Sequence, residues 1–412
     1  MELELNELEK KNLEMIQKHL TIEFGLTRLT PTMFQKAIID ASELIRKALL
    51  RGDFIDYSKI GQGPNYKLVK NGLFFTENKD VEIEASFYRP KTKKGDPRFW
   101  IYNLKNLNIA KVDDLIFISV LKLKNEEAKL LAINLSNSIL EETKIELLAN
   151  SDELLSRYEE KLSAAINELF PLVKEIMKSD PVPNYKGAGK QHYKDVGQTF
   201  EHLLNIKDNS DKRADYKNLI ELKAKRVKAK SKDTLFSMVP NYNYASINGS
   251  NEMIRTFGYP SNKYPDFIDL FVTVSTKENN QGLYLKVNEN EERIEQWYLN
   301  SQTGKKELTC VWLFNEIEKR LFDKHNTTLW CLAKEQIIDD TVYFDYFAAE
   351  LSKRPSLSAF ITLVETGDII FDWRGRVKEN RTGYKDKGHA WRMKPTARKI
   401  LFGEVEPVSI AE

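Results

Sequence analysis

The sequence predicts a mixed α/β or α+β protein that folds as two domains. At 412 residues the chain is longer than one typical domain, and its 41% of hydrophobic residues can fill ordinary cores. The C-terminal half alternates strand-like and helical segments, for example 282–288, 310–324 and 368–377. A stretch of proline, glycine and polar residues at 179–190 separates this half from the N-terminal half.

The composition excludes several classes of protein. The 63 basic and 61 acidic residues give a net charge of only +2, so attraction to a polyanion has to come from local clusters. The two cysteines, Cys310 and Cys331, form no CxxC motif, which excludes a disulfide framework and a cysteine-rich zinc site. No stretch has the pattern of a signal peptide or a membrane span. We therefore expect a cytoplasmic globular protein.

The N-terminal half predicts strands on either side of a basic and aromatic loop. Segments 80–90 and 113–123 are patterned as strands, and 34–50 is patterned as a helix. Between the two strands, five cations are interleaved with aromatic residues, a composition suited to phosphates and bases. The five are Arg89, Lys91, Lys93, Lys94 and Arg98. A solvated loop between core aromatic residues would have the same composition.

Three regions follow from these patterns. Residues 1–140 are expected to form an N-terminal domain, whose basic and aromatic loop makes it a candidate for DNA binding. Residues 141–186 would be a helical connector and linker, because 143–178 repeats apolar residues three and four apart before the prolines and glycines begin. Residues 187–412 would form the C-terminal domain.

The stretch 214–230, ADYKNLIELKAKRVKAK, places an acidic and apolar run directly before a basic one. In a strand from Leu219 to Lys223, Glu221 and Lys223 would share one face about 6 to 7 Å apart, while the residues between them face the core. Asp215 could return to the same edge from a preceding strand or turn. The sequence therefore predicts two carboxylates and one ammonium at one point.

This set of groups suits metal-assisted hydrolysis of a phosphodiester. Two carboxylates supply the hard oxygen ligands that Mg²⁺ prefers, and the ion neutralises charge on a scissile phosphate. Lys223 would orient or help to deprotonate the attacking water and stabilise the added charge. The same residue spacing also arises by chance in charged proteins, where it marks a surface strand with an ordinary salt bridge.

Two neighbouring segments favour the catalytic interpretation. Segment 196–205 is patterned as a helix, and its Glu201 could add a third carboxylate to the pocket, although a solvent-facing glutamate is the more common case. The basic run after the motif, with Lys225 and Arg226, would meet the phosphate backbone beside the scissile bond.

These residues resemble the catalytic region of the MvaI/BcnI-like restriction endonucleases, relatives of the MutH mismatch-repair nicking enzyme. The resemblance extends in order along the chain from about Gly187 to Val408, slightly over half of it. Agreement in order over that length is far more specific than the short motif. The matching segments are 196–237, 310–324, 328–336, 364–377 and 386–408.

The resemblance implies a PD-(D/E)XK nuclease core in the C-terminal half and Mg²⁺-dependent cleavage of double-stranded DNA. Carried over to this sequence, Asp215 and Glu221 are metal ligands, Lys223 is the catalytic lysine, and Glu201 is the supporting carboxylate on a helix. The interval from Asp215 to Glu221 lies between the shorter and the longer intervals of the two branches of the family. Residues 187–412 would then be the endonuclease domain.

Segment 372–393 is expected to read bases, because arginine and lysine commonly pair with guanine edges in the major groove. Its candidate DNA contacts are Arg374, Arg376, Tyr384, Lys385, Lys387, His389 and Arg392. Arg374 and Arg392 fall where the family has recognition arginines. MvaI-like members have histidines in place of Lys385 and Lys387, so their CC(A/T)GG-type specificity is not carried over. A lone histidine such as His389 is more often structural than catalytic.

The N-terminal half lies outside this resemblance, but its basic loop is similar to the pseudobarrel effector domain of EcoRII-type enzymes, which binds a second DNA copy and regulates cleavage. The sequence thus predicts a type II restriction endonuclease with an N-terminal DNA-binding regulatory domain. We expect double-stranded DNA and Mg²⁺ as partners, a cognate methyltransferase in the same system, and a monomer or weak dimer. Three alternatives stay open: a MutH-like nickase, a methylation-dependent nuclease, and a non-catalytic DNA-binding regulator on a nuclease scaffold.

Overall fold

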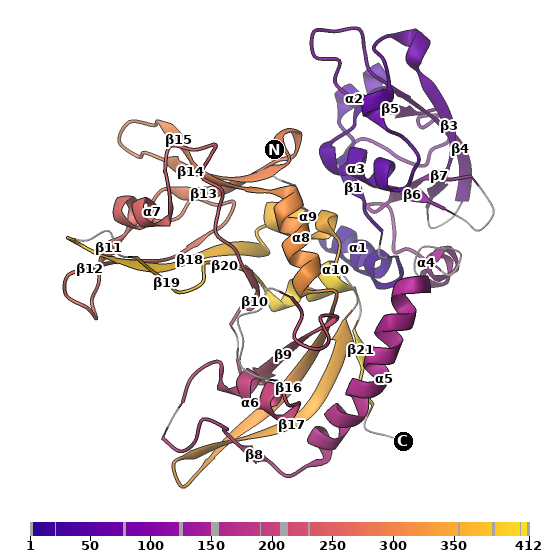
Figure 1. Cartoon of the computed structure of the whole chain (residues 1–412). Coiled ribbons are helices and arrows are strands. Elements are labelled where there is room, and N and C mark those ends of the chain that lie inside the picture. Colours follow the sequence, from indigo (N-terminus) through magenta and orange to yellow (C-terminus); the bar gives the residue numbers. More distant parts are fainter. Residues whose placement is uncertain are drawn as a thin grey trace.

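The computed structural model is a mixed α/β protein with an N-terminal domain, a helical connector and a larger C-terminal part (Figure 1). No helix in the described part of the chain is long and apolar enough to cross a membrane. The structure describes residues 3–20, 22–76, 80–122, 127–149, 156–189, 191–206, 213–229, 231–352, 355–380, 384–403 and 405–409.

A seven-stranded sheet forms the N-terminal domain. Its order is β1 (Gly25–Arg28), β6 (Leu115–Leu121), β7 (Lys129–Asn134), β3 (Leu68–Phe75), β4 (Asp80–Tyr88), β5 (Arg98–Ile101) and β2 (Ile39–Asp40). Neighbouring strands are antiparallel except for β3 and β7, which are parallel. The predicted strands are confirmed as β4, which alternates in burial, and β6, which is buried throughout. A sheet of this kind is consistent with the predicted pseudobarrel.

The predicted helix at 34–50 is wrong in its first part. α2 (Pro31–Lys36) ends there, and Ala37 turns the chain with a φ of 53° before β2. α3 (Glu43–Arg51) begins only after Ser42, whose hydroxyl accepts a hydrogen bond from a backbone N–H in the first turn. The apolar residues that suggested one long helix belong to two helices and a strand, because Ile39 leaves the helical pattern and pairs with β5.

Three helices connect the two parts. α1 (Glu7–His19) begins near the N-terminus, and α4 (Glu142–Ala149) and α5 (Ser156–Lys178) follow the N-terminal sheet, so the described residues of the predicted helical stretch 143–178 are helical. The predicted linker after α5 is packed against the C-terminal part. Its β8 (Val182–Pro183) pairs with β17, and the N–H of Gly189 donates to the carbonyl oxygen of Asp340 at 2.9 Å.

One sheet of the C-terminal part carries the predicted catalytic strand. Its order is β21 (Glu406–Pro407), β17 (Thr341–Ser352), β16 (Thr327–Ile338) and β9 (Ile220–Arg226). β9 and β16 are parallel, whereas the other pairs are antiparallel. α5 and α6 (Asp195–Leu203) pack on this sheet through a core that includes Leu169, Val173 and Phe200.

The rest of the C-terminal part is a second lobe. One sheet has the order β10 (Asp233–Ser237), β20 (Ala390–Met393), β18 (Ile369–Lys378), β12 (Phe267–Val274) and β11 (Tyr259–Pro260), with β19 (Tyr384–Asp386) paired to β18. Another has the order β13 (Leu283–Asn288), β14 (Arg293–Leu299) and β15 (Lys306–Leu313). The helices are α7 (Ser250–Phe257), α8 (Phe314–Lys324), α9 (Leu357–Glu365) and α10 (Arg398–Phe402). Trp312, Phe371 and Trp391 form its aromatic core, with ring centroids 4.4 to 5.1 Å apart.

The N-terminal domain packs against the second lobe through a shared apolar core, which includes Phe24 and Phe360, and also through charged groups. Arg51 of α3 pairs with Glu23 at 3.2 Å and also with Glu318 of α8. Glu23 accepts a hydrogen bond of 2.8 Å from the Ser358 hydroxyl at the start of α9. The two parts therefore meet at the helices of the second lobe, and α8, which contacts Arg51, ends at the candidate active site.

Candidate active site

Asp215 and Glu221 face each other across a tight turn. Lys217 and Asn218 in this turn have φ values of 51° and 60°. An antiparallel β-bridge between Tyr216 and Ile220 closes the turn. Two successive left-handed residues are typical of a type I′ hairpin turn. Counting outward from the bridge, Asp215 stands opposite Glu221, and its Oδ2 accepts the N–H of Leu222 at 3.2 Å. The turn thus brings both carboxylates to one edge, as the sequence predicted.

β9 alternates as predicted. Ile220 and Leu222 are buried in the core of the sheet. Glu221 and Lys223 lie together on the other face, with Nζ of Lys223 2.6 Å from Oε1 of Glu221. The Glu221 side chain is 1% exposed, whereas that of Lys223 is 29% exposed, so the lysine stands at the entrance of the cluster and the glutamate at its base.

Lys324 completes the cluster, and the sequence did not predict it. Its Nζ lies 3.0 Å from Oδ1 of Asp215, 2.8 Å from Oε2 of Glu221 and 3.1 Å from the carbonyl oxygen of Arg213. Lys324 ends α8, which leads into β16, the parallel neighbour of β9, so the end of this helix comes beside the start of β9. A separation of 109 residues from Asp215 leaves no local signal. The pairing of β9 with β16 was the information needed to find it.

Burial and charge together set the protonation of this cluster. Burial, and next the negative charge of Glu221, raise the pKa of Asp215 above its ordinary value. Burial lowers the pKa of Lys324, but attraction to Glu221 and Asp215 outweighs this, so its net shift is upward. Lys324 therefore carries a proton at neutral pH.

The neighbouring His325 anchors the end of α8. Its ring is fully buried, and burial lowers its pKa to about 3, so the imidazole is neutral. Nε2 lies 2.9 Å from the carbonyl oxygen of Leu235 and donates to it, while Nδ1 lies 2.9 Å from the hydroxyl of Thr328. The backbone next to Lys324 is thereby held, and its side chain is left to move.

The cluster has the ligands for a divalent cation. Asp215, Glu221 and the carbonyl oxygen of Arg213 are hard oxygen donors, which suit Mg²⁺. The buried Oε2 of Glu221 is contacted by the Lys324 ammonium at 2.8 Å, so a positive charge already lies at this oxygen. A cation satisfies such an oxygen. The residues present therefore fit a magnesium ion.

Glu201 lies on α6, which packs against β9. Its side chain is half-buried. Burial above all, and nearby charges that include Glu201, raise the pKa of the Tyr346 phenol on β17. The structure thus places Glu201 on the helix that covers the catalytic strand, near Tyr346.

The basic run after the motif is partly paired within the protein. Lys225 forms an ion pair with Asp233 at 2.8 Å. Arg226 pairs with Glu335, and its guanidinium lies 5.2 Å from the ring centroid of Phe344. The run therefore connects β9 to its neighbours as well as adding positive charge beside the cluster.

The candidate base-reading arginines project from one sheet of the second lobe. Arg374 and Arg376 alternate along β18 with buried residues of the lobe core. Arg376 pairs with Asp269 of β12 at 3.0 Å, and its guanidinium lies 4.2 Å from the ring centroid of Tyr264. Arg392 of β20 pairs with Asp372 at 2.8 Å. The guanidinium groups of Arg376 and Arg392 are thus oriented by carboxylates on neighbouring strands.

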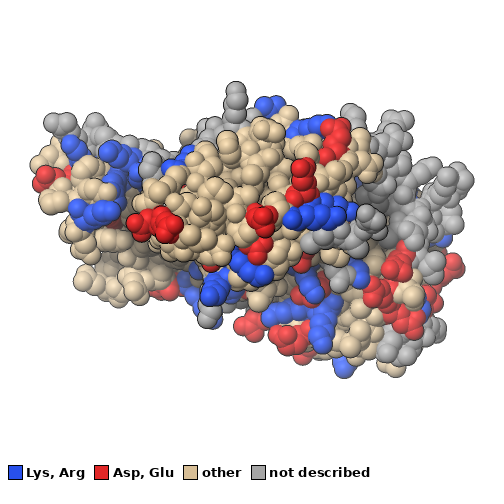
Figure 2. All heavy atoms as spheres, turned by 90° about the horizontal axis from the view of Figure 1, so that it is seen from below, with Lys and Arg blue, Asp and Glu red and all other residues tan. Residues whose placement is uncertain are grey.

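The remaining candidates of this segment differ in exposure. Lys385 and Lys387 are exposed. His389 is 1% exposed, and its Nδ1 accepts the backbone N–H of Arg374 at 2.9 Å, so its imidazole supports β18 from inside. Tyr384 belongs to β19, but its side chain lies outside the described part of the structure. Seen from below, basic side chains gather at the end of the molecule formed by this lobe (Figure 2).

The N-terminal candidates lie on the loop between β4 and β5. Lys91, Lys93 and Lys94 are exposed. Arg89 donates from Nε to the carbonyl oxygen of Gly95 at 2.8 Å, and Arg98 pairs with Asp40 at 3.0 Å. The two arginines therefore shape the loop, and the three lysines present its charge to solvent.

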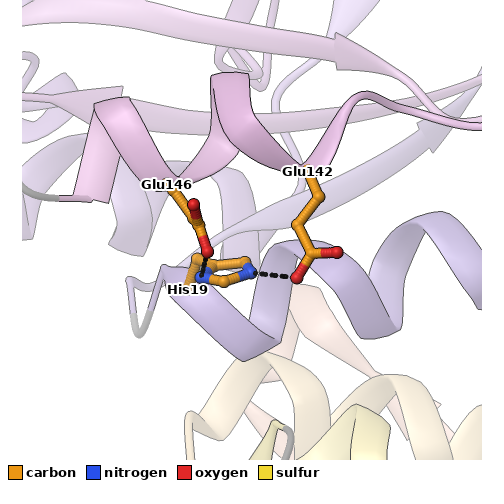
Figure 3. A group of neighbouring side chains, drawn as sticks. All are labelled: His19, Glu142 and Glu146. Atoms are coloured by element: carbon orange, nitrogen blue, oxygen red, sulfur yellow. Dashed lines mark hydrogen bonds and ion pairs between the residues drawn. The ribbon is translucent and has the colours of Figure 1, made fainter.

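A different group of possible metal ligands lies between α1 and α4 (Figure 3). Nε2 of His19 is 3.0 Å from Glu142, and Nδ1 is 3.8 Å from Glu146. Lys18 also pairs with Glu142 at 2.7 Å. The two ring nitrogens face different carboxylates, so in this arrangement His19 joins α1 to α4 through polar contacts.

Comparison with known proteins gives a family match and similar solved structures. The model of the MvaI/BcnI restriction endonuclease family matches residues 172–402. A solved complex of restriction endonuclease MvaI with its cognate DNA substrate is 21% identical, covers 59% of this chain and 98% of its own, and has a TM-score of 0.51. MvaI in the absence of DNA is 20% identical, covers 63% of this chain and 100% of its own, and has a TM-score of 0.39. Comparison with curated proteins gives no match.

The family match includes α6, β9, α8 and most of the second lobe, which together build the cluster and the arginine-bearing sheet. The likeness to the DNA-bound MvaI structure shows a shared fold. Family and fold indicate a type II restriction endonuclease that acts on DNA. The matched residues make up more than half of the chain, which therefore belongs to the MvaI/BcnI restriction endonuclease family.

Proposed function

We propose that this protein cleaves double-stranded DNA at a short specific sequence by Mg²⁺-dependent hydrolysis in a PD-(D/E)XK site. The observation that carries the proposal is the hairpin that sets Asp215 opposite Glu221, with Lys223 2.6 Å from Glu221 on the same strand face. Membership of the restriction endonuclease family supports the same class of reaction.

Each group of the cluster has its own part in this hydrolysis. Asp215 and Glu221 would hold the ion, with the carbonyl oxygen of Arg213 within reach as a further ligand. When bound, Mg²⁺ would supply positive charge that stabilises the scissile phosphate and would make the attacking water more acidic. Lys223 holds the attacking water and stabilises the negative charge that builds up as the water oxygen bonds to phosphorus and the ester P–O bond breaks. Glu201 supports the site from α6.

The sheet around β18 reads the DNA sequence in this proposal. Arg374 reaches a base edge, while Arg376 and Arg392 are held by Asp269 and Asp372 in orientations that leave guanidinium N–H groups for bases or phosphates. The exposed Lys385 and Lys387 contact the phosphate backbone, with Tyr384 beside them and Lys225 and Arg226 near the scissile bond. His389 contributes by positioning the backbone of Arg374.

The N-terminal domain binds a second DNA segment and regulates cleavage. The exposed Lys91, Lys93 and Lys94 support this role, and a cavity of about 260 Å³ lies beside them, lined among others by Lys67 and Tyr88. The contact from Arg51 to α8 gives this domain a connection to the helix that carries Lys324.

The biological setting follows from the proposed reaction. Both cysteines are buried and free, as expected in a reducing compartment, so we place the enzyme in the cytoplasm. A nuclease that cuts unmodified DNA there needs a cognate methyltransferase to protect the host DNA. The protein acts as a monomer or weak dimer.

The test is incubation of a supercoiled plasmid, methylated or unmethylated, with the protein and Mg²⁺. Linear product and then discrete fragments are expected, and EDTA should prevent both. Nicked circles without linear product would identify a nickase, and cleavage of methylated plasmid alone would identify a methylation-dependent enzyme. DNA binding without cleavage on either plasmid would identify a non-catalytic regulator and contradict the proposal.

A further inference from the structure

We infer that Lys324 competes with the metal ion for Asp215 and Glu221, and that DNA relieves this competition, so that the enzyme binds its metal tightly only when DNA is present. The inference rests on the proposed function, because it concerns the same metal ligands. It assigns a role to a residue that lies 109 positions from Asp215 in the sequence.

Lys324 contacts the same oxygens that would bind the metal ion. Nζ of Lys324 contacts one oxygen of each carboxylate, at 3.0 Å for Asp215 and 2.8 Å for Glu221, and the carbonyl oxygen of Arg213 at 3.1 Å. These are the oxygens that would ligate Mg²⁺, which prefers distances of about 2.1 Å. An ion at that distance from the same oxygens would lie against the ammonium. The two cations therefore exclude each other from one position.

The positive charge of Lys324 makes the cluster electrically neutral. Asp215 and Glu221 bring two negative charges, and Lys223 and Lys324 bring two positive ones, so the four side chains sum to zero. A neutral cluster attracts a divalent ion weakly. Without the Lys324 charge the same cluster is anionic and attracts a divalent ion more strongly. Because the side chains of the cluster are 1% to 29% exposed, water screens this attraction incompletely.

The side chain of Lys324 can change its position while the backbone at the end of α8 stays in place. His325 is buried and hydrogen-bonded through both ring nitrogens, so the backbone at the end of α8 is held. Lys324 itself has four rotatable side-chain bonds and a 14% exposed side chain at the surface of the cluster. A DNA phosphate that arrives beside Lys223 offers this ammonium a new anionic partner. When the Lys324 ammonium moves to the phosphate, both carboxylates become available to the metal ion.

This arrangement links metal binding to substrate binding. By thermodynamic linkage, if DNA increases the affinity for metal, metal must increase the affinity for DNA by the same factor. An enzyme of this kind holds little metal in the absence of DNA, which limits stray hydrolysis. Lys324 is a positioning residue in this account, since it acts through the two carboxylates.

The experiment is a calorimetric titration of the DNA-free full-length protein with Mn²⁺. Lys324→Met should bind Mn²⁺ roughly 10- to 100-fold more tightly than the native protein. Lys324→Arg keeps the charge and should bind as weakly as the native protein. Lys319→Met removes an exposed lysine from the same helix and is the matched control. A Lys324→Met variant with native or weaker Mn²⁺ affinity would overturn the inference, as would an Arg variant that binds as tightly as the Met variant.

Melting temperatures check that the variants fold and add an independent readout. In EDTA the Lys324→Met variant should melt below the native protein, because two buried carboxylates lose a cation, and Mn²⁺ should raise its melting temperature more than that of the native protein. Equal responses to Mn²⁺ would overturn the inference. If neither the native protein nor Lys324→Met binds Mn²⁺, the metal site itself is absent, and the proposed function fails together with the inference.

The link to DNA is measured as binding of a labelled duplex that carries the cleavage site, in EDTA and in Ca²⁺. The native protein should gain more DNA affinity from Ca²⁺ than Lys324→Met gains. Equal gains in the two proteins would show that Lys324 does not couple DNA to metal. Denaturing gels run after each measurement confirm that the duplex is intact.

Discussion

Nζ of Lys223 lies 2.6 Å from Oε1 of Glu221, and both side chains leave the same face of β9. The pair joins a buried carboxylate to a partly exposed ammonium at the edge where Asp215 returns through its hairpin turn. The carboxylate of Glu221 therefore lies at the base of the cluster, and the ammonium of Lys223 lies at its exposed end.

Replacing Lys223 tests its catalytic part. Lys223→Met should lower the single-turnover cleavage rate by roughly 10²- to 10⁴-fold, because the water loses its orienting group and the added charge loses its nearest cation. DNA affinity should change little, since one charge among many phosphate contacts is removed. Cleavage at the native rate would show that Lys223 has no part in the reaction.

Replacing Asp215 tests the metal site. Asp215→Asn should abolish cleavage in Mg²⁺ and leave DNA binding as strong as in the native protein or stronger, because a negative charge beside the phosphate disappears. Gel-shift titration and a cleavage assay on the same duplex measure both effects. A variant that loses DNA binding and cleavage in parallel would indicate a structural role for this carboxylate instead.

Two substitutions in the second lobe separate base reading from phosphate contact. Arg374→Ala should lower the discrimination against altered sites by about 1–3 kcal/mol per affected base pair. Lys387→Ala should weaken binding to all sequences alike and reduce the slope of affinity against salt concentration by about one unit. Competition binding with a library of duplexes measures both. Identical effects of the two substitutions would contradict the assignment.

The N-terminal loop can be tested without touching the active site. A triple variant in which Lys91, Lys93 and Lys94 become Ser should weaken binding of a second DNA segment and leave the metal site intact. The slope of the logarithm of DNA affinity against the logarithm of salt concentration should fall by up to about three units. Activation of cleavage by an added duplex should therefore disappear. Unchanged activation would remove this loop from the regulatory site.

The interface between the two parts contains a carboxyl pair that makes stability depend on pH. Burial, and next a hydrogen bond with Glu292, raise the pKa of Glu43 to about 7 from its ordinary value of 4.5. Between these values the folded protein keeps a proton that the unfolded chain has lost, so the free energy of unfolding falls as the pH rises through this window. The hydrogen bond with Glu43 lowers the pKa of Glu292 from its ordinary value of 4.5, so Glu292 changes the free energy of unfolding only below this window.

Glu43→Gln should remove this dependence, because an amide has no proton to lose. Between pH 5 and pH 7 its free energy of unfolding should fall less than that of the native protein, by at most about 3 kcal/mol. Urea unfolding at the two pH values measures the difference, with the exposed Glu278→Gln as control. Equal falls in native and Glu43→Gln proteins would contradict the expected effect of the pair.

The sequence was sufficient for features that local patterns determine. The alternation in β4 and β9 predicted those strands, and the spacing from Asp215 to Glu221 predicted a turn that returns the first carboxylate. Local patterns failed where tertiary contacts decide. The helix expected at 34–50 is divided because Ile39 enters the sheet, and the presumed linker at 179–190 is packed because β8 pairs with β17.

The residues of the candidate site also differ in whether local sequence patterns or tertiary contacts bring them together. Asp215, Glu221 and Lys223 are close in sequence and could be found together. Lys324 could not, because only the parallel pairing of β9 and β16 brings the end of α8 beside them. His389, a candidate DNA contact, is buried, which agrees with the structural alternative stated for a lone histidine.

Under the proposed function, Asp215, Glu221 and Lys223 form a metal-dependent nuclease site that cuts DNA at one sequence. The most direct measurement is digestion of methylated and unmethylated phage DNA in Mg²⁺, with sequencing of the fragment ends, for the native protein, Asp215→Asn, Lys223→Met and the control Lys319→Met. We predict discrete fragments that share one short sequence at their ends, produced by the native protein and the control and absent with the two active-site variants. Fragments that persist with both active-site variants, or no Mg²⁺-dependent cleavage of either DNA, would contradict the account.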